Sequence, residues 1–198
     1  MKTIVLASGS PRRRELLKRV VPAFEVLADG GEEMLIPGES PEETVRRLAM
    51  QKAENTARRI KKDALILAAD TVVVLGEKIL GKPVDEAEAF AMLFSLSGKT
   101  HRVYTGLAIV DTGTGKKISD FVVTKVRFRP LTEEEIRSYI RSGEPMDKAG
   151  AYGIQEIGAL FIEGIDGDYF NVVGLPLCRL GILLKESFGI DLAEEIQK

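Results

Sequence analysis

Three consecutive arginines, Arg12 to Arg14, follow the turn Ser8-Gly9-Ser10-Pro11 near the start of the chain. Ser10 is a good helix N-cap and proline suits the first helical position, so the arginines are predicted to lie in the first turn of a helix. That end of a helix carries about half a positive charge, and each cation there is disfavoured by about 0.3–1 kcal/mol unless an anion joins it. Free backbone N–H groups and the paired N–H groups of a guanidinium can donate hydrogen bonds to phosphate oxygens. We therefore predict a phosphate site in this turn, with three solvated arginines as the simpler alternative.

Two further charged residues stand in apolar surroundings. Lys52 lies near the middle of the apolar face of a helix that a capping box at Ser40 predicts to run to about Arg59. A lysine on that face needs an anion, unless its stem covers the core edge while the ammonium reaches water. Asp70 follows the apolar run Ala64 to Ala69, at the expected end of a strand buried on both faces. A carboxylate there could bind a metal or accept a proton from water, whereas a turn-forming aspartate is the structural alternative.

The segment Gly76 to Pro83 comes close to a Walker A motif, but proline stands where that motif needs Ser or Thr and a helix. A hairpin turn at Gly76-Glu77-Lys78 explains the glycines better and leaves Lys82 on a turn from which it could reach a phosphate. Further along, Gln155 ends a glycine-rich stretch that begins at Asp147. Its amide offers both a donor and an acceptor, which is what reading a nucleotide base edge requires.

Composition limits the classes of partner. The chain has 198 residues, 44% of them hydrophobic, and a net charge of −2, which fits a globular domain without an electrostatic footprint for nucleic acid. Neither a cleavable signal nor an apolar run of about 20 residues is visible, so we expect a cytoplasmic protein without membrane contact. The sole histidine, His101, excludes multi-histidine metal sites. The sole cysteine, Cys178, lies among leucines and is expected to be a buried structural thiol.

The elements that must position these side chains alternate between helix and strand patterns. They predict one α/β domain over residues 1–198, with a mixed, twisted sheet flanked by helices and a possible division into two lobes around a central cleft. Helices are predicted from Pro11, from Ser40 to about Arg59, from Asp85 to about Gly98, from Thr132 to Gly143 and from Leu177 to Phe188. Strands are predicted over 3–7, over 64–69 up to Asp70-Thr71, over 72–75, 102–110 and 118–128, with a hairpin over 160–173 around Asp166-Gly167-Asp168.

Several segments together closely resemble the Maf family, in the family's order and at its spacing from Thr3 to about Phe188. The resemblance implies a nucleoside triphosphate pyrophosphatase, which cleaves between the α and β phosphates to give a nucleoside monophosphate and pyrophosphate. It also implies an elongated α/β fold with a cleft, similar to inosine triphosphate pyrophosphatases, a family association with septum formation, and a homodimer. The segments are Ser8 to Arg13, Glu33, Lys52, Ala69 to Thr71, Gly81 to Pro83, Leu96 to His101, Asp147 to Gln155 and Asn171 to Pro176.

Site residues follow from the same resemblance. It implies that Asp70 accepts a proton from the attacking water, and that Glu33 and Asp70 hold a divalent metal, magnesium or manganese. The triphosphate would be held by Ser8 and the residues up to Ser10, together with Arg13, Lys52 and Lys82.

Three positions resemble the family branch that hydrolyses dTTP and UTP, including some modified pyrimidine nucleotides: Arg12, Thr71 and Gln155. Glu156 departs from the branch, which commonly has glycine there, and this bears on the local backbone conformation. Two other functions use similar residues. A nucleotidyltransferase would pass the nucleotidyl group to a second substrate, and a nucleotide-sensing regulator of septum formation would bind without turnover.

Overall fold

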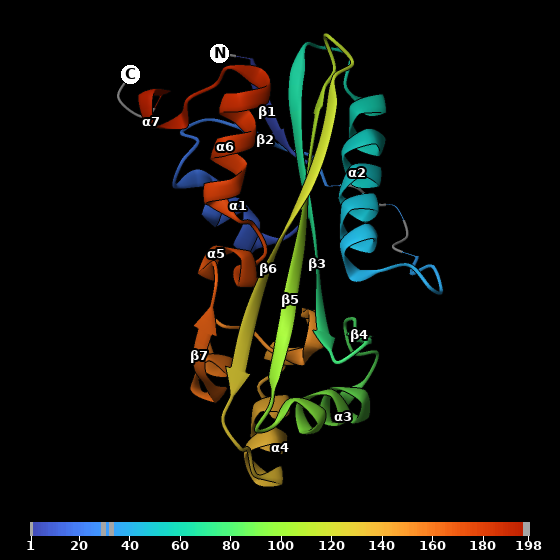
Figure 1. Ribbon diagram of the computed structural model, residues 1–198, viewed down its shortest axis with the longest axis vertical. Coiled ribbons are helices and arrows are strands. Elements are labelled where there is room, and N and C mark those ends of the chain that lie inside the picture. The colour runs from blue at the N-terminus through green and yellow to red at the C-terminus, as the bar shows by residue number, and fades with distance from the viewer. Residues whose placement is uncertain (1, 29–30, 32–33, 196–198) are drawn as a thin grey trace. The chain divides into compact units, whose positions relative to one another are not determined.

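The computed structural model describes residues 2–28, 31 and 34–195 (Figure 1). The chain divides into two compact units. The first comprises Met1–Asp70, Thr105–Val122 and Gly174–Lys198, and the second comprises Thr71–Tyr104 and Val123–Val173. The described residues form a seven-stranded sheet in the order β2-β1-β3-β5-β6-β7, with β4 paired to β3, and it contains parallel and antiparallel pairs. The predicted α/β fold with a mixed sheet is confirmed.

Helix starts in the first unit follow the capping signals in the sequence. The Ser10 and Ser40 hydroxyls accept hydrogen bonds from the third backbone N–H of α1 and α2, and Glu43 completes the capping box of α2. The elements of this unit are β1 (Thr3–Leu6), α1 (Pro11–Lys18), β2 (Glu25–Val26), α2 (Pro41–Arg59), α6 (Leu177–Phe188) and α7 (Leu192–Glu195), together with parts of the long strands β3 (Ala64–Leu75), β5 (Thr100–Asp111) and β6 (Lys117–Phe128).

Helix α2 packs on the sheet through small side chains. Ala49 and Ala53 share a buried cluster with Ile66 and Ala68 of β3. A Cβ atom at Gly106 of β5 would lie 2.1 Å from the Val45 carbonyl oxygen, so only glycine permits this approach of helix to strand. The inward face of α2 is therefore fixed against β3, and Figure 1 shows the helix running alongside these strands.

The second unit has its own core, built around aromatic rings. Phe128 makes edge-to-face contacts with His101, Tyr152 and Phe161. Its further elements are β4 (Lys78–Leu80), α3 (Glu86–Leu96), α4 (Glu133–Arg141), β7 (Ile162–Asp166), α5 (Tyr169–Val173) and three 3-10 segments, Glu144–Asp147, Ala149–Ala151 and Ile157–Phe161. The predicted hairpin after Gly76 is confirmed, because β3 and β4 pair antiparallel with Leu75 opposite Lys78.

Three sequence predictions are wrong. Asp70 does not end its strand: β3 continues without a break to Leu75, so the polar pair at 70–71 interrupts the apolar pattern but not the backbone pairing. The segment 160–173 is no hairpin, since β7 pairs with β6 and the chain after Asp168 forms α5. Cys178 is exposed, because it lies in the first turn of α6 on the side away from its buried leucines.

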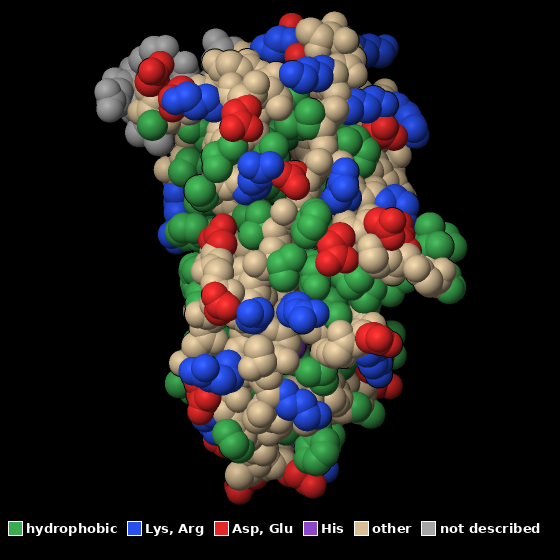
Figure 2. All heavy atoms as spheres, in the orientation of Figure 1, with side chains coloured by type: hydrophobic (Ala, Val, Ile, Leu, Met, Phe, Trp, Pro, Cys, Tyr) green, Lys and Arg blue, Asp and Glu red, His purple; other side chains and the backbone are tan. Residues whose placement is uncertain are grey.

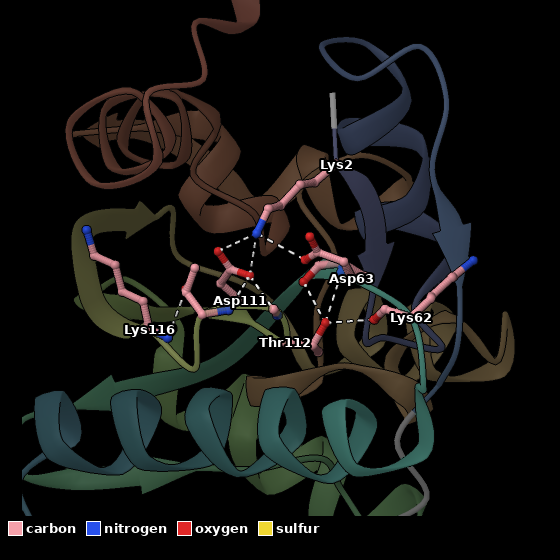
Figure 3. A network of polar contacts seen from close by, with 9 residues as sticks. Lys2, Lys62, Asp63, Asp111, Thr112 and Lys116 are labelled. Carbon is pink, nitrogen blue, oxygen red and sulfur yellow. Dashed lines mark hydrogen bonds and ion pairs between the residues drawn. The ribbon is translucent and has the colours of Figure 1, made fainter.

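A polar network ties the tip of the β5–β6 hairpin to neighbouring strands in the first unit (Figure 3). The Lys2 ammonium donates to both Asp111 carboxylate oxygens at 2.8 Å and lies 3.0 Å from Asp63. The Thr112 hydroxyl accepts from the Ala64 backbone N–H at 2.9 Å. Burial alone would raise the pKa of Asp111, but the hydrogen bonds from Lys2, Thr114 and Gly113 lower it. These contacts join the residue before β1, the start of β3 and the hairpin tip, which fits a structural role.

Charged side chains of both signs alternate over the face of the molecule shown in Figure 2, rather than gathering into one patch. Among the helices of the described ranges, none has the length and apolar character required to cross a bilayer.

Candidate active site

An ion pair between α2 and β3 forms the centre of the candidate site. The Lys52 ammonium lies 2.5 Å from Asp70 Oδ1, and the two side chains are only 12% and 5% exposed. Even-numbered residues of β3 face α2, which is why Asp70 follows Ile66 and Ala68 onto this face. The anion that a lysine on the buried face requires is therefore the predicted catalytic carboxylate itself.

The turn after β1 lies beside the same strand. Leu6 of β1 is in register with Leu67 of β3, and the Ala7 backbone N–H donates to the Leu67 carbonyl at 2.7 Å. Ser8, which is buried, therefore leaves β1 next to the segment of β3 that leads to Asp70. Its hydroxyl accepts from the Ser10 backbone N–H at 3.2 Å, which stabilises the turn.

The arginines lie in the first turn of α1, as predicted. Arg13 and Arg12 are both half-buried, whereas Arg14 is exposed. The Arg13 guanidinium donates through Nε to the carbonyl of Gly174 at 2.8 Å. That contact holds the side chain of Arg13 against the loop before α6. The first unit thus brings a serine turn and a helix start with cations to the carboxyl end of β1, which lies beside the middle of β3, the strand that carries Asp70 of the Lys52–Asp70 pair.

Three predicted site residues belong to the second unit. Thr71 follows Asp70 in β3, and strand alternation turns its side chain to the opposite face. Lys82 lies exposed in the segment after β4. Gln155 lies exposed in the loop before the last 3-10 segment. Glu156 beside it has φ −121°, outside the left-handed region that requires glycine, so this departure from the family pattern causes no backbone strain of that kind.

Of the two predicted metal ligands, Glu33 and Asp70, only Asp70 is among the described residues. Glu33 lies outside the described residues. Among the residues that the structure does describe, no group of three or more His, Cys, Asp or Glu side chains comes together. Magnesium does not need one, because it is usually held by one or two carboxylates together with substrate phosphates and water. The buried carboxylate of Asp70, a hard oxygen donor, fits that donor set.

Sequence reasoning missed Arg47, which lies five residues before Lys52 on α2. Its guanidinium donates to both oxygens of Glu39, at 2.7 and 2.6 Å, and to the Met34 carbonyl at 2.9 Å. The hydrogen bonds to Glu39 raise the pKa of Arg47, and the charge of Asp70 adds to this effect. Arg47 is therefore held mainly by Glu39, and the charge of Asp70 acts on it as a smaller influence. Its place in the first turns of a helix that also carries Lys52 was the available signal.

Comparison with known proteins agrees with the motifs. A curated dTTP/UTP pyrophosphatase of Alkaliphilus oremlandii (strain OhILAs) is 50% identical over 192 residues, which is 97% of this chain and 100% of that protein. A curated dTTP/UTP pyrophosphatase of Carboxydothermus hydrogenoformans is 53% identical over 183 residues, which is 92% of this chain and 97% of that protein.

Among solved structures, the Staphylococcus aureus Ham1 protein matches this chain with a TM-score of 0.47 at 15% identity, covering 64% of this chain and 72% of that one.

A model of the Maf-like protein family matches residues 3–187. That match spans nearly the whole chain and includes every residue of the candidate site, so the chain belongs to the Maf-like protein family.

Proposed function

We propose that this protein hydrolyses dTTP and UTP to the nucleoside monophosphate and pyrophosphate. The observation that carries the proposal is the buried Lys52–Asp70 pair on α2 and the middle of β3, beside the Ser8 turn that follows β1. Relatives with half their residues identical to this chain bear the name dTTP/UTP pyrophosphatase. The site and the relatives therefore support the same reaction.

In the proposed reaction, Asp70 accepts a proton from a water molecule while the oxygen of that water attacks the α phosphorus. The new P–O bond forms while the bond between that phosphorus and the α–β bridging oxygen breaks, and pyrophosphate leaves with the electron pair. Negative charge grows on the phosphate oxygens during this step, so nearby cations stabilise the transition state. Arg13, Lys52 and Lys82 supply that charge in the proposal, with Ser8 and Arg12 binding the triphosphate.

Lys52 has a second task in this proposal. Its ammonium holds Asp70 Oδ1 in place at 2.5 Å, on a strand and a helix that are packed against each other. Because the carboxylate is already held in place, no further side-chain conformational entropy is lost when it faces the attacking water molecule.

A divalent cation, magnesium or manganese, belongs to the proposal. Asp70 and Glu33 would hold it, and when bound it would neutralise phosphate charge and make a bound water more acidic. Metal binding can be tested without turnover. Titration of the protein with manganese should show saturable binding, and Asp70→Asn should weaken the affinity for manganese.

Recognition of the base is assigned to the second unit. Gln155 would read the uracil or thymine edge through its amide, whose donor and acceptor match the N–H and carbonyl of that edge. Thr71 completes the set of residues proposed to contact the substrate.

Product analysis tests the proposed function. The protein is incubated with UTP, dTTP, CTP and GTP in turn, with magnesium or manganese, and the products are separated by anion-exchange chromatography. Monophosphate and pyrophosphate from UTP and dTTP are the expected products. Release of inorganic phosphate and a diphosphate contradicts the proposal, and so does binding without turnover, the behaviour of a nucleotide sensor. Turnover that requires a second nucleotidyl acceptor would instead indicate a nucleotidyltransferase.

A further inference from the structure

The loop that carries Gln155 is held by side chains from elsewhere in the second unit. It runs from Gly153 to Gly158, which lies in the first turn of the 3-10 segment Ile157–Phe161, and Gln155 and Glu156 at its centre are exposed. A loop of this kind has few backbone hydrogen bonds of its own to define its shape. The contacts at its two ends therefore determine where Gln155 lies.

Glu144 holds the far end of this loop. Its carboxylate accepts hydrogen bonds from the backbone N–H groups of Ile157, at 3.0 Å to Oε2, and Gly158, at 3.2 Å to Oε1. The Tyr139 hydroxyl donates to the same Oε1 at 2.7 Å. Each of these groups is a donor, so both oxygens of the Glu144 carboxylate act as acceptors.

Tyr139 holds the near end. Its hydroxyl oxygen accepts from the Gly153 backbone N–H at 3.1 Å while its proton goes to Glu144. The ring is 2% exposed and makes an edge-to-face contact with Phe161, so the hydroxyl cannot move away. Hydrogen bonds from these two side chains therefore bracket Gln155, two residues after one anchor and two residues before the other.

The fit around these anchors is close. A Cβ atom at Gly158 would lie 2.5 Å from the Gly153 carbonyl oxygen and 2.8 Å from the Tyr139 hydroxyl, so the ends of the loop are in contact. Lys148, only 7% exposed, donates from its ammonium to the Glu144 carbonyl at 2.6 Å and to Asp147 at 2.8 Å. The backbone of Glu144 is thus fixed as well as its carboxylate.

We propose that Glu144 and Tyr139 are positioning residues that set the base selectivity of the enzyme by fixing the loop of Gln155. The inference rests on the proposed function, because it takes Gln155 as the residue that reads the base. Neither residue contacts the triphosphate in this proposal, and both act through the loop.

Glu144→Gln is the sharpest test, because it keeps the shape of the side chain and replaces one acceptor with an NH2 group. The new NH2 group would face either the Ile157 N–H or the two donors that contact Oε1, the Gly158 N–H and the Tyr139 hydroxyl. In either orientation a donor faces a donor, so one end of the loop loses its anchor. The matched control is Glu163→Gln on β7, a carboxylate of the same unit that is 46% exposed and lies 3.0 Å from Arg127. The readouts are kcat and KM for UTP and CTP, together with the inhibition constant of inorganic triphosphate, which has no base.

For Glu144→Gln, we expect KM for UTP to rise about 10-fold, the effect of losing roughly one charge-assisted hydrogen bond, while kcat for UTP changes little. The preference for UTP over CTP should fall by a similar factor. The inhibition constant of inorganic triphosphate should stay unchanged, because the triphosphate site is not altered, and Glu163→Gln should match the wild type throughout. Tyr139→Phe, which keeps the buried ring, should change the same quantities in the same direction by a smaller factor.

Equal losses with UTP, CTP and inorganic triphosphate in both variants would overturn the inference, since they would indicate a general structural role. Gln155→Glu separates this inference from the proposed function. If Gln155→Glu abolishes the preference for UTP while Glu144→Gln and Tyr139→Phe keep it, the inference fails and base reading by Gln155 stands. If Glu144→Gln abolishes the preference and Gln155→Glu does not, the loop is positioned as proposed and another of its groups reads the base.

Discussion

The two units hold their proposed functional side chains in different ways. In the first unit, Asp70 and Lys52 stand on a twelve-residue strand and a nineteen-residue helix, and the pair lies where these elements pack. In the second unit, Gln155 stands on an irregular loop whose ends are held by Tyr139 and Glu144. Regular backbone positions the first group, and side-chain hydrogen bonds position the second.

This difference suits the two tasks. Attack on phosphorus demands a fixed carboxylate, and ladders of backbone hydrogen bonds fix the elements that carry it. A loop held by a few side chains can be changed without disturbing the sheet, so the base that is read can change while the reaction stays the same. Substitutions in the first unit should therefore affect all nucleotides, and those in the second unit should affect some more than others.

The largest expected effect is that of Asp70→Asn, which keeps the size of the side chain but removes its charge and basicity. Turnover of every nucleotide should fall by at least about 100-fold, the lower range for a positioned base. The measurement is kcat for UTP and dTTP at saturating metal, with Asp166→Asn, 78% exposed on β7, as the control. Turnover near the wild-type value would remove Asp70 from the mechanism, and a loss confined to one nucleotide would break the comparison between the units.

A second change tests the pair as a unit of structure. Lys52→Met leaves the buried Asp70 carboxylate without its closest cation, and removing one partner of a buried pair lowers the free energy of unfolding by about 3 kcal/mol. The double variant Lys52→Met/Asp70→Asn should lose less than the single one, because no buried charge remains unpaired. Urea unfolding of Lys52→Met, Asp70→Asn, the double variant and the wild type measures this. A double variant as unstable as the sum of the single changes would show that the two residues act independently.

The last expected effect is spread over a pH range and concerns the second unit. His101 is 1% exposed and shares a hydrogen bond of 2.7 Å with the Tyr152 hydroxyl, and burial lowers its pKa from 6.5 to about 4. Between those values the unfolded chain binds a proton that the folded chain does not. The contribution of His101 to stability should therefore fall as the pH drops from 6.5 to 4, at no more than about 1.4 kcal/mol per pH unit, and level off below.

His101→Gln keeps a hydrogen-bonding group beside Tyr152 without a titrating ring. Its free energy of unfolding, measured by urea denaturation at several pH values, should decline less than that of the wild type between pH 6.5 and 4. Equal slopes for the two proteins would show that His101 is protonated in the folded state as readily as in the unfolded one.

Local signals in the sequence predicted much of the fold. Capping boxes at Ser40 and Thr132 and the N-cap at Ser10 mark helices that the structure confirms, because a cap depends on residues within one turn of each other. Two of the predictions that proved wrong depend on distant partners. A strand partner in β6 determines that β7 ends before α5, and Asp70 stays inside β3 because the strand remains paired beyond it.

By itself, the sequence determined the cations at the start of α1, the lysine on the inner face of α2 and the set of motifs that places the chain in its family. Only the tertiary structure decided that the anion beside Lys52 is Asp70, that Arg47 lies within the field of that carboxylate, and that Glu144 and Tyr139 anchor the loop of Gln155. The physical reason is the distance along the sequence over which each kind of interaction acts. Caps and periodicity act over a turn of helix or a few residues of strand, whereas ion pairs and loop anchors join residues that only packing brings together.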